Sequence, residues 1–240
     1  MEFNYAAYRS FLSLLLEQGY AIANYHNYPK KSRCVILRHD IDQSIEKAVI
    51  MGEIEAREGI SSTYFVLLTS DIYNASSAQS KKMLQTLRKQ GHEIGLHFDE
   101  KSYSKSVDIL SAILNEVDIL EKICGTSIRT VSMHRPSQET LNSNLQIPGM
   151  VNCYEQTFFQ HFKYLSDSRR HWKEPVLDII KSHQFERLHI LTHPFWYEES
   201  TSSISATITR FVNHANKERY CAMQNNIREL STIMTESDVL

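Results

Sequence analysis

One stretch decides the expected fold: residues 33–42 have the sequence RCVILRHDID. Its first half is short, apolar and partly β-branched, which is typical of a buried strand. This strand delivers residues 38–42 at its C-terminal end. Because alternate residues of an extended chain point the same way, the side chains of Asp40 and Asp42 are expected on one face. The stretch therefore predicts two neighbouring carboxylates at the end of a core strand.

Strand and helix patterns alternate on both sides of this stretch. Helices are expected at residues 8–16, 44–59, 80–90, 104–124 and 202–234, and further strands at 62–68, 92–96, 128–133 and 187–192. After Pro136 the pattern weakens into loop with short elements. This alternation predicts an α/β fold, a distorted (β/α) barrel of about seven parallel strands with extra N- and C-terminal helices.

Length and charge limit the class of protein. A chain of 240 residues can form one core, so we expect a single domain over 1–240, with an N-terminal helical extension at 1–30, a catalytic barrel at 33–197 and a C-terminal helix at 202–235. The 26 Lys and Arg nearly balance the 28 Asp and Glu, which argues against nucleic acid or an anionic membrane as partner. A small molecule or a glycan is the expected partner, and the oligomeric state is open.

The cysteines and the N-terminus indicate the compartment. Cys34, Cys124, Cys153 and Cys221 lie far apart, which argues against a thiolate zinc site and against a disulfide framework. The apolar run at 11–16 is too short for a membrane span, and no basic start of a signal peptide precedes it. We therefore expect a cytoplasmic protein without membrane insertion.

Polar clusters follow four of the expected strands, at residues 38–42, 97–100, 134–135 and 193. Since active sites of such barrels lie at the C-terminal ends of the strands, these clusters are expected to meet. One aspartate of the first cluster could bind a cation while the other accepts a proton from water. The alternative for Asp42 is to cap the helix that begins near Ser44.

The histidines offer nitrogen ligands and a proton donor. His97 is a candidate metal ligand, and His134 could complete a site of two histidines and one aspartate or could simply be a polar group of a turn. Arg135 could orient a carboxylate with both arms of its guanidinium. His193 could donate a proton to a leaving amine. Trp196 offers a surface for a sugar ring, with a place in a lid or the core as the alternative.

The motifs resemble those of the polysaccharide deacetylase family, carbohydrate esterase family 4, over residues 35–197. The likeness rests on residues 40–42 (DID), residues 91–97 (GHEIGLH), residues 135–136 (RP) and residues 191–193 (LTH). In this resemblance Asp40 is the catalytic base, and Asp42 and His97 are metal ligands. Arg135 positions the base, and His193 is the general acid.

A looser match concerns the pocket walls. Asp167 and Trp172 resemble the family's aspartate and tryptophan that tune the catalytic histidine and line the pocket. Trp172 is accordingly expected to contact the substrate. Trp196, through its aromatic surface, and Tyr64, through a nearby backbone NH that stabilises the oxyanion, are the other expected substrate contacts. The pattern also resembles a subgroup of deacetylase-like proteins associated with bacterial surface-polysaccharide (O-antigen or capsule) synthesis.

The chain departs from the family at one ligand. The family has a second metal-binding histidine four residues after the first, where this sequence has Lys101. His134 is the first candidate to replace it and Asp99 the second.

The resemblance implies a metal-dependent hydrolase, with a divalent ion such as zinc, that removes an N-acetyl or N-formyl group from an amino sugar or glycan. Two alternatives stay open. One is a catalytically altered relative that binds glycans or has a regulatory role, and the other is an amidohydrolase that acts on a non-sugar amide.

Overall fold

The computed structural model describes residues 1–239. The chain forms two compact units, Met1–Glu199 and Ser200–Leu240. The first unit holds the whole sheet. The second holds helix α8 (Ile204–Asn226), which is shorter than the expected 202–234 because the chain leaves the helix at Ile227 and continues in two short 3-10 turns. Among the described residues, no helix is both long and apolar enough to cross a membrane.

The sheet of the first unit is parallel throughout. Its strands are β1 (Ala21–Ala23), β2 (Cys34–Ile41), β3 (Thr63–Leu67), β4 (Glu93–Phe98), β5 (Thr130–Met133), β6 (Val151–Asn152), β7 (Lys163–Ser166) and β8 (Arg187–Thr192). The order is β6-β5-β4-β3-β2-β8-β7, and β1 pairs with β2 beside this path. The result is a curled half-barrel, which confirms the predicted α/β class and the distorted barrel of about seven strands.

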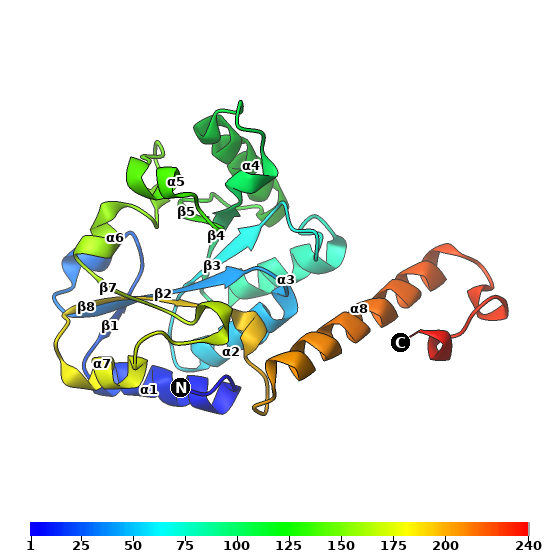
Figure 1. Ribbon diagram of the computed structural model, residues 1–240, viewed down its shortest axis with the longest axis horizontal. Helices are drawn as coiled ribbons and strands as arrows, with labels where there is room; N and C mark the ends of the chain where they lie inside the picture. The colour runs from blue at the N-terminus through cyan, green and yellow to red at the C-terminus, as the bar shows by residue number, and fades with distance from the viewer. Residues whose placement is uncertain (240) are drawn as a thin grey trace. The chain divides into compact units, whose positions relative to one another are not determined.

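Five helices cover the outer face of this sheet (Figure 1): α1 (Tyr5–Glu17), α2 (Ile45–Arg57), α3 (Ala78–Lys89), α4 (Ile109–Cys124) and α7 (Val176–Ser182). Two shorter helices, α5 (Gln138–Ser143) and α6 (Gln156–Gln160), lie between β5 and β7, and Phe158 of α6 packs against the interior face of β2. The predicted long strands and helices are present. The sequence analysis missed β1, β6 and β7, since strands of two to four residues carry too little periodicity to be recognised.

Successive side chains of strand β2 point alternately to the outer face of the sheet and to the barrel interior. Val35 and Leu37 are buried on the side of α1 and α7, and Cys34 and Ile36 are buried in the barrel interior among aromatic rings. The alternation continues beyond the apolar part, so Arg38 and Asp40 share the interior face of the strand.

The outward residue His39 belongs to a buried polar network behind the site. The carboxylate of Glu55 in α2 accepts hydrogen bonds from His39 Nε2 (2.8 Å), Tyr8 Oη (2.6 Å), Tyr64 Oη (2.8 Å) and Ser62 Oγ (2.5 Å). Burial alone would raise the pKa of Glu55, but His39 and the other donors lower it to about 2. Every strong acceptor site of this buried carboxylate is thus used, as burial of a charge demands.

The start of α2 resolves the alternative for Asp42. Ser44 is the N-cap of this helix, and its hydroxyl accepts a hydrogen bond from the backbone amide of Lys47. Asp42 does not cap the helix and remains available at the end of β2.

Candidate active site

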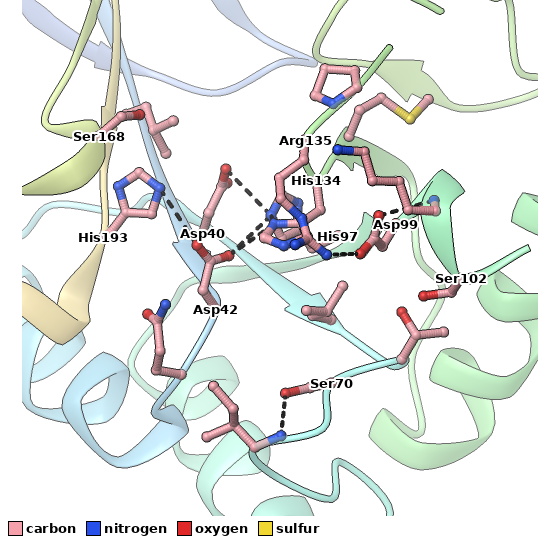
Figure 2. Close-up of a pocket in the computed structure, with 18 of the residues that line it drawn as sticks. Asp40, Asp42, Ser70, His97, Asp99, Ser102, His134, Arg135, Ser168 and His193 are labelled. Atoms are coloured by element: carbon pink, nitrogen blue, oxygen red, sulfur yellow. Dashed lines mark hydrogen bonds and ion pairs between the residues drawn. The ribbon is translucent and has the colours of Figure 1, made fainter. Parts of the chain in front are cut away.

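The expected polar clusters meet at the C-terminal edge of the sheet. A pocket of about 980 Å³ is lined there by residues at or just after the C-terminal ends of β2, β3, β4, β5, β6, β7 and β8. This volume is at the upper end of the range for small-molecule sites. In Figure 2 His193 lies on one side of Asp40 and Asp42, and His97 and His134 lie on the other.

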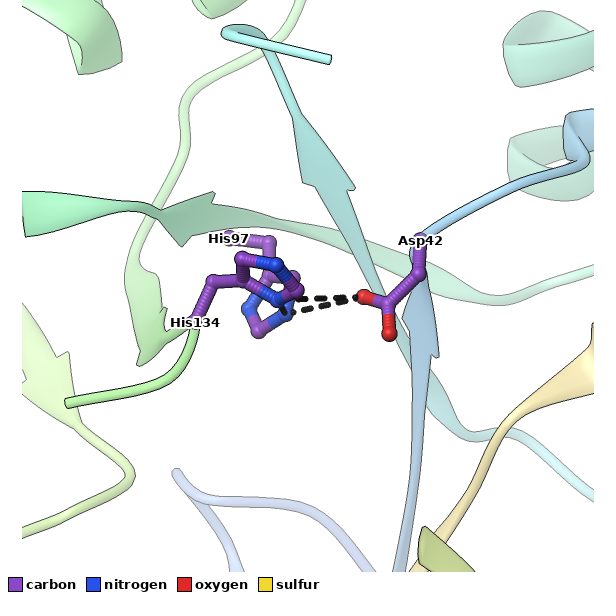
Figure 3. A group of neighbouring side chains, drawn as sticks. All are labelled: Asp42, His97 and His134. Atoms are coloured by element: carbon purple, nitrogen blue, oxygen red, sulfur yellow. Dashed lines mark hydrogen bonds and ion pairs between the residues drawn. The ribbon is translucent and has the colours of Figure 1, made fainter. Parts of the chain in front are cut away.

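Asp42, His97 and His134 form a candidate metal centre (Figure 3). Asp42 Oδ1 lies 3.2 Å from His97 Nε2 and 3.4 Å from His134 Nδ1, and the two nitrogens are 3.0 Å apart. Ligands of a tetrahedral zinc ion at about 2.0–2.1 Å lie about 3.3 Å from one another. The three donor atoms are therefore spaced like ligands of one small divalent cation.

The electrostatics of Asp42 agree with this reading. Burial would raise its pKa, but the imidazoles of His134 and His97 more than offset that effect and lower the pKa well below its ordinary value. The carboxylate is consequently ionised, which is the form that binds a metal.

The third donor of this group, His134, comes from the segment after β5. Lys101 lines the pocket but is not part of the three-ligand group. Asp99, the second candidate, is engaged elsewhere: it accepts a hydrogen bond from Arg135 at 2.5 Å and one from the Lys101 amide. His134 reaches the site because β5 lies next to β4, with His97 paired to Ser132 in register.

Asp40 is held by a different arginine from the one predicted. The Nη2 atom of Arg38 donates to Asp40 Oδ2 at 2.7 Å and lies 2.7 Å from Ser132 Oγ, and both charged side chains are buried. Arg135 instead bonds to Asp99, and its side chain is 60% exposed. The prediction that Arg135 positions Asp40 is therefore wrong: its backbone, with a positive φ of 50°, carries the side chain to the rim.

Arg38 also controls the charge of Asp40. Burial would raise the pKa of this carboxyl, but the adjacent guanidinium and the nearby histidines hold it below its ordinary value. Asp40 Oδ1 is buried and has no hydrogen-bond partner within residues 1–239. One oxygen of an ionised carboxylate is thus left free beside the candidate metal centre.

His193 is oriented from behind by Asp167. His193 Nδ1 lies 2.6 Å from Asp167 Oδ1, and Asp167 also accepts from the His193 amide and from Tyr197 Oη. The other ring nitrogen, Nε2, lies 3.8 Å from Asp42 Oδ2. Burial would lower the pKa of His193, but Asp167 outweighs it and raises the pKa to about 9. The imidazole is therefore protonated at neutral pH.

The three expected substrate contacts lie outside the pocket lining. Tyr64 is fully buried and bonds to Glu55. Trp172 and Trp196 pack against the apolar cluster around α1 and α7. The aromatic rings that do line the pocket are Tyr154 and Tyr164, which the sequence analysis missed because they lie in the weakly patterned segment after Pro136.

Comparison with known proteins gives matches at the level of structure alone. No protein-family model matches the chain, and no curated protein matches it. Among solved structures it is similar to a polysaccharide deacetylase from Bacillus cereus, at 15% identity over 78% of this chain and 88% of that one, with a TM-score of 0.48. It is also similar to a family 4 carbohydrate esterase from Bacillus anthracis, at 15% identity over 84% and 83%, with a TM-score of 0.45.

A third similar structure is a carbohydrate esterase family 4 pseudoenzyme from Bacillus anthracis, at 13% identity over 79% of this chain and 62% of that one, with a TM-score of 0.44. This chain thus spans less than two thirds of the length of that protein. The solved structures are of the family that the sequence motifs resemble. A shared fold does not by itself determine the chemistry of a site.

Proposed function

We propose that the protein is a metal-dependent hydrolase that removes an N-acetyl or N-formyl group from an amino sugar or glycan. The observation that supports this most is the meeting, in one pocket, of a three-ligand cation site, a free carboxylate oxygen and a protonated histidine. Amide hydrolysis needs a polarised carbonyl, a base for the attacking water and an acid for the leaving amine.

Asp42, His97 and His134 would hold the ion. A divalent metal, when bound, supplies Lewis-acid polarisation of the amide carbonyl and of the attacking water. One oxygen ligand and two nitrogen ligands suit zinc and similar borderline ions, so zinc is part of the proposal.

Asp40 is the general base of the proposed reaction. Its free Oδ1 accepts the proton of the water as the water attacks the amide carbon. Arg38 keeps this carboxylate ionised and fixes its orientation through Oδ2. Because Oδ2 is already bound to Arg38, the proton of the water is accepted at Oδ1.

His193 is the general acid. The bond from Nδ1 to Asp167 directs Nε2 toward the two aspartates, so its proton faces the position of the leaving nitrogen. A pKa of about 9 keeps the proton on the ring until the amine leaves. Asp167 stabilises the charged ring and sets its orientation.

A role in bacterial surface-polysaccharide synthesis and a cytoplasmic location complete the proposal. The motif pattern supports the first. The second is supported by the four free cysteines, which are common where disulfides do not form.

The test measures metal content and acetate or formate release on the same preparation. The proposal expects about one divalent ion per chain and hydrolysis of an acetamido sugar, with both lost after chelation and restored by zinc. Asp40→Asn should keep the ion and lose at least about 100-fold in rate. Full binding of an acetamido-sugar oligomer with neither metal nor hydrolysis would identify the chain as a glycan-binding relative instead.

A further inference from the structure

The pocket carries more positive charge than the proposed chemistry uses. Besides the histidines, four lysine and arginine side chains line it: Lys101, Arg135, Arg169 and Lys173. Arg135 is neutralised by Asp99. The side chains of the other three are exposed and form no hydrogen bond or ion pair with another residue of the described range 1–239. A chain with a net charge of only −2 thus places three unpaired cations around one site.

These cations are unevenly distributed. Arg169 and Lys173 both follow β7, and Figure 2 shows the neighbouring Ser168 on the His193 side of the site. Lys101 follows β4, and its neighbour Ser102 lies beyond Asp99. Of the acidic residues in the wall, Asp71 forms no ion pair within residues 1–239, and it comes from the loop after β3. Two of the three unpaired cations therefore come from the segment after β7, which begins with Asp167, the partner of His193.

The turn that carries Arg169 is strained. Arg169 and Arg170 have φ values of 60° and 56°, in the left-handed region. That conformation costs a non-glycine residue about 1–2 kcal/mol. The same turn leads from Asp167, which orients His193, to the pocket wall. A glycine or asparagine would adopt it at lower cost, yet the sequence places two arginines there.

The chemistry of the pair defines what it can hold. A guanidinium binds two oxygens of a phosphate or carboxylate at once, and a nearby ammonium adds a point charge. The pocket volume of about 980 Å³ leaves room for such a group beside the acetamido sugar.

We infer that the substrate is anionic, and that Arg169 and Lys173 bind a phosphate or carboxylate group next to the sugar whose amide is cleaved. The inference rests on the proposed function, since it places the amide against the candidate metal centre. It adds that neutral amino-sugar polymers are poor substrates.

The experiment compares three probes by calorimetry on the full chain: uridine diphosphate N-acetylglucosamine, an oligosaccharide of alternating glucuronate and N-acetylglucosamine, and a neutral N-acetylglucosamine tetramer. The variants are Arg169→Asn, which suits a left-handed backbone, Lys173→Gln, and both together. Lys181→Gln, an exposed lysine of α7 outside the pocket, is the control for a change in net charge.

The inference expects at least one acidic probe to bind at least about tenfold more tightly than the neutral tetramer, and the double variant to abolish that advantage. Raising the salt concentration should weaken binding of the acidic probe more in the wild type than in the double variant. The probe that binds more tightly, nucleotide or uronate, identifies phosphate or carboxylate as the anion.

Equal affinity for charged and neutral probes would overturn the inference. It would also be overturned if Lys181→Gln weakened binding of the acidic probe as much as the pocket variants do. The two proposals fail separately. Anion-dependent binding without acetate release would contradict the proposed hydrolase activity and support the anion site. Release of acetate from the neutral tetramer, with no effect of the variants, would contradict the anion site and support the hydrolase activity.

Discussion

Arg38 and Asp40 form a buried ion pair between two residues of the same strand, with Arg38 Nη2 and Asp40 Oδ2 2.7 Å apart. The remaining face of the guanidinium lies against the rings of Phe65 and Tyr154. The pair thus fixes the candidate base from within β2, and the rim arginine Arg135 is free for Asp99.

Replacement of Arg38 should affect both stability and rate. Arg38→Gln leaves a buried carboxylate without its counter-charge, so we expect a loss of about 3–5 kcal/mol in the free energy of unfolding. If the variant does not fold, Arg38→Lys keeps the charge without the planar fork, and should lower kcat at least about 100-fold while it folds. Arg135→Gln is the matched control, with a smaller loss of kcat. A larger effect at Arg135 than at Arg38 would show that the rim arginine positions the base.

The third ligand can be tested by metal analysis. His134→Ala should bring the metal content well below one ion per chain, because one of three protein ligands is gone. Lys101→Ala should leave it unchanged. His161→Ala, an exposed histidine away from the site, controls for the loss of any imidazole. Unchanged metal content in His134→Ala would remove this residue from the ligand set.

Asp167 can be tested by a change that keeps its shape. Asp167→Asn preserves the volume but removes the charge that raises the pKa of His193, so we expect kcat to fall about 100-fold to 10,000-fold. Far-ultraviolet circular dichroism checks that the fold is kept. Asp178→Asn, at an exposed position of α7, should be neutral. Wild-type kcat in Asp167→Asn would exclude His193 as an acid that depends on Asp167.

Glu55 predicts how stability depends on pH. Its pKa is about 2 in the folded protein against an ordinary value of 4.5, so the folded state favours the ionised form. The stabilisation is complete above pH 4.5 and is lost as the pH falls toward 2. It amounts to about 3 kcal/mol at neutral pH.

Urea unfolding between pH 3 and pH 7 measures this effect. Glu55→Gln should flatten that part of the stability profile, and Glu53→Gln, at an exposed position of the same helix, should not. Parallel profiles for Glu55→Gln and the wild type would mean that other carboxyls cause the acid sensitivity.

Local sequence was sufficient for the main elements. Periodicity and flanking glycines predicted the long helices of the barrel and its long strands, since burial of one face imposes a repeat of 3.6 or of 2 residues. The rule that strand ends carry the site brought Asp40, Asp42, His97, His134 and His193 to one edge. Asp40 and His97 lie near the C-terminal ends of β2 and β4, and the other three directly follow a strand, so their place follows from the chain itself.

Tertiary structure decided which partner each of these residues has. Arg38 and Arg135 are both arginines near a strand end, and only the alternation of β2 and the positive φ of Arg135 show that the first meets Asp40. The approach of His134 to Asp42 and His97 depends on the pairing of β4 with β5. The pairing of distant segments has no local pattern, because it is set by packing of the whole sheet.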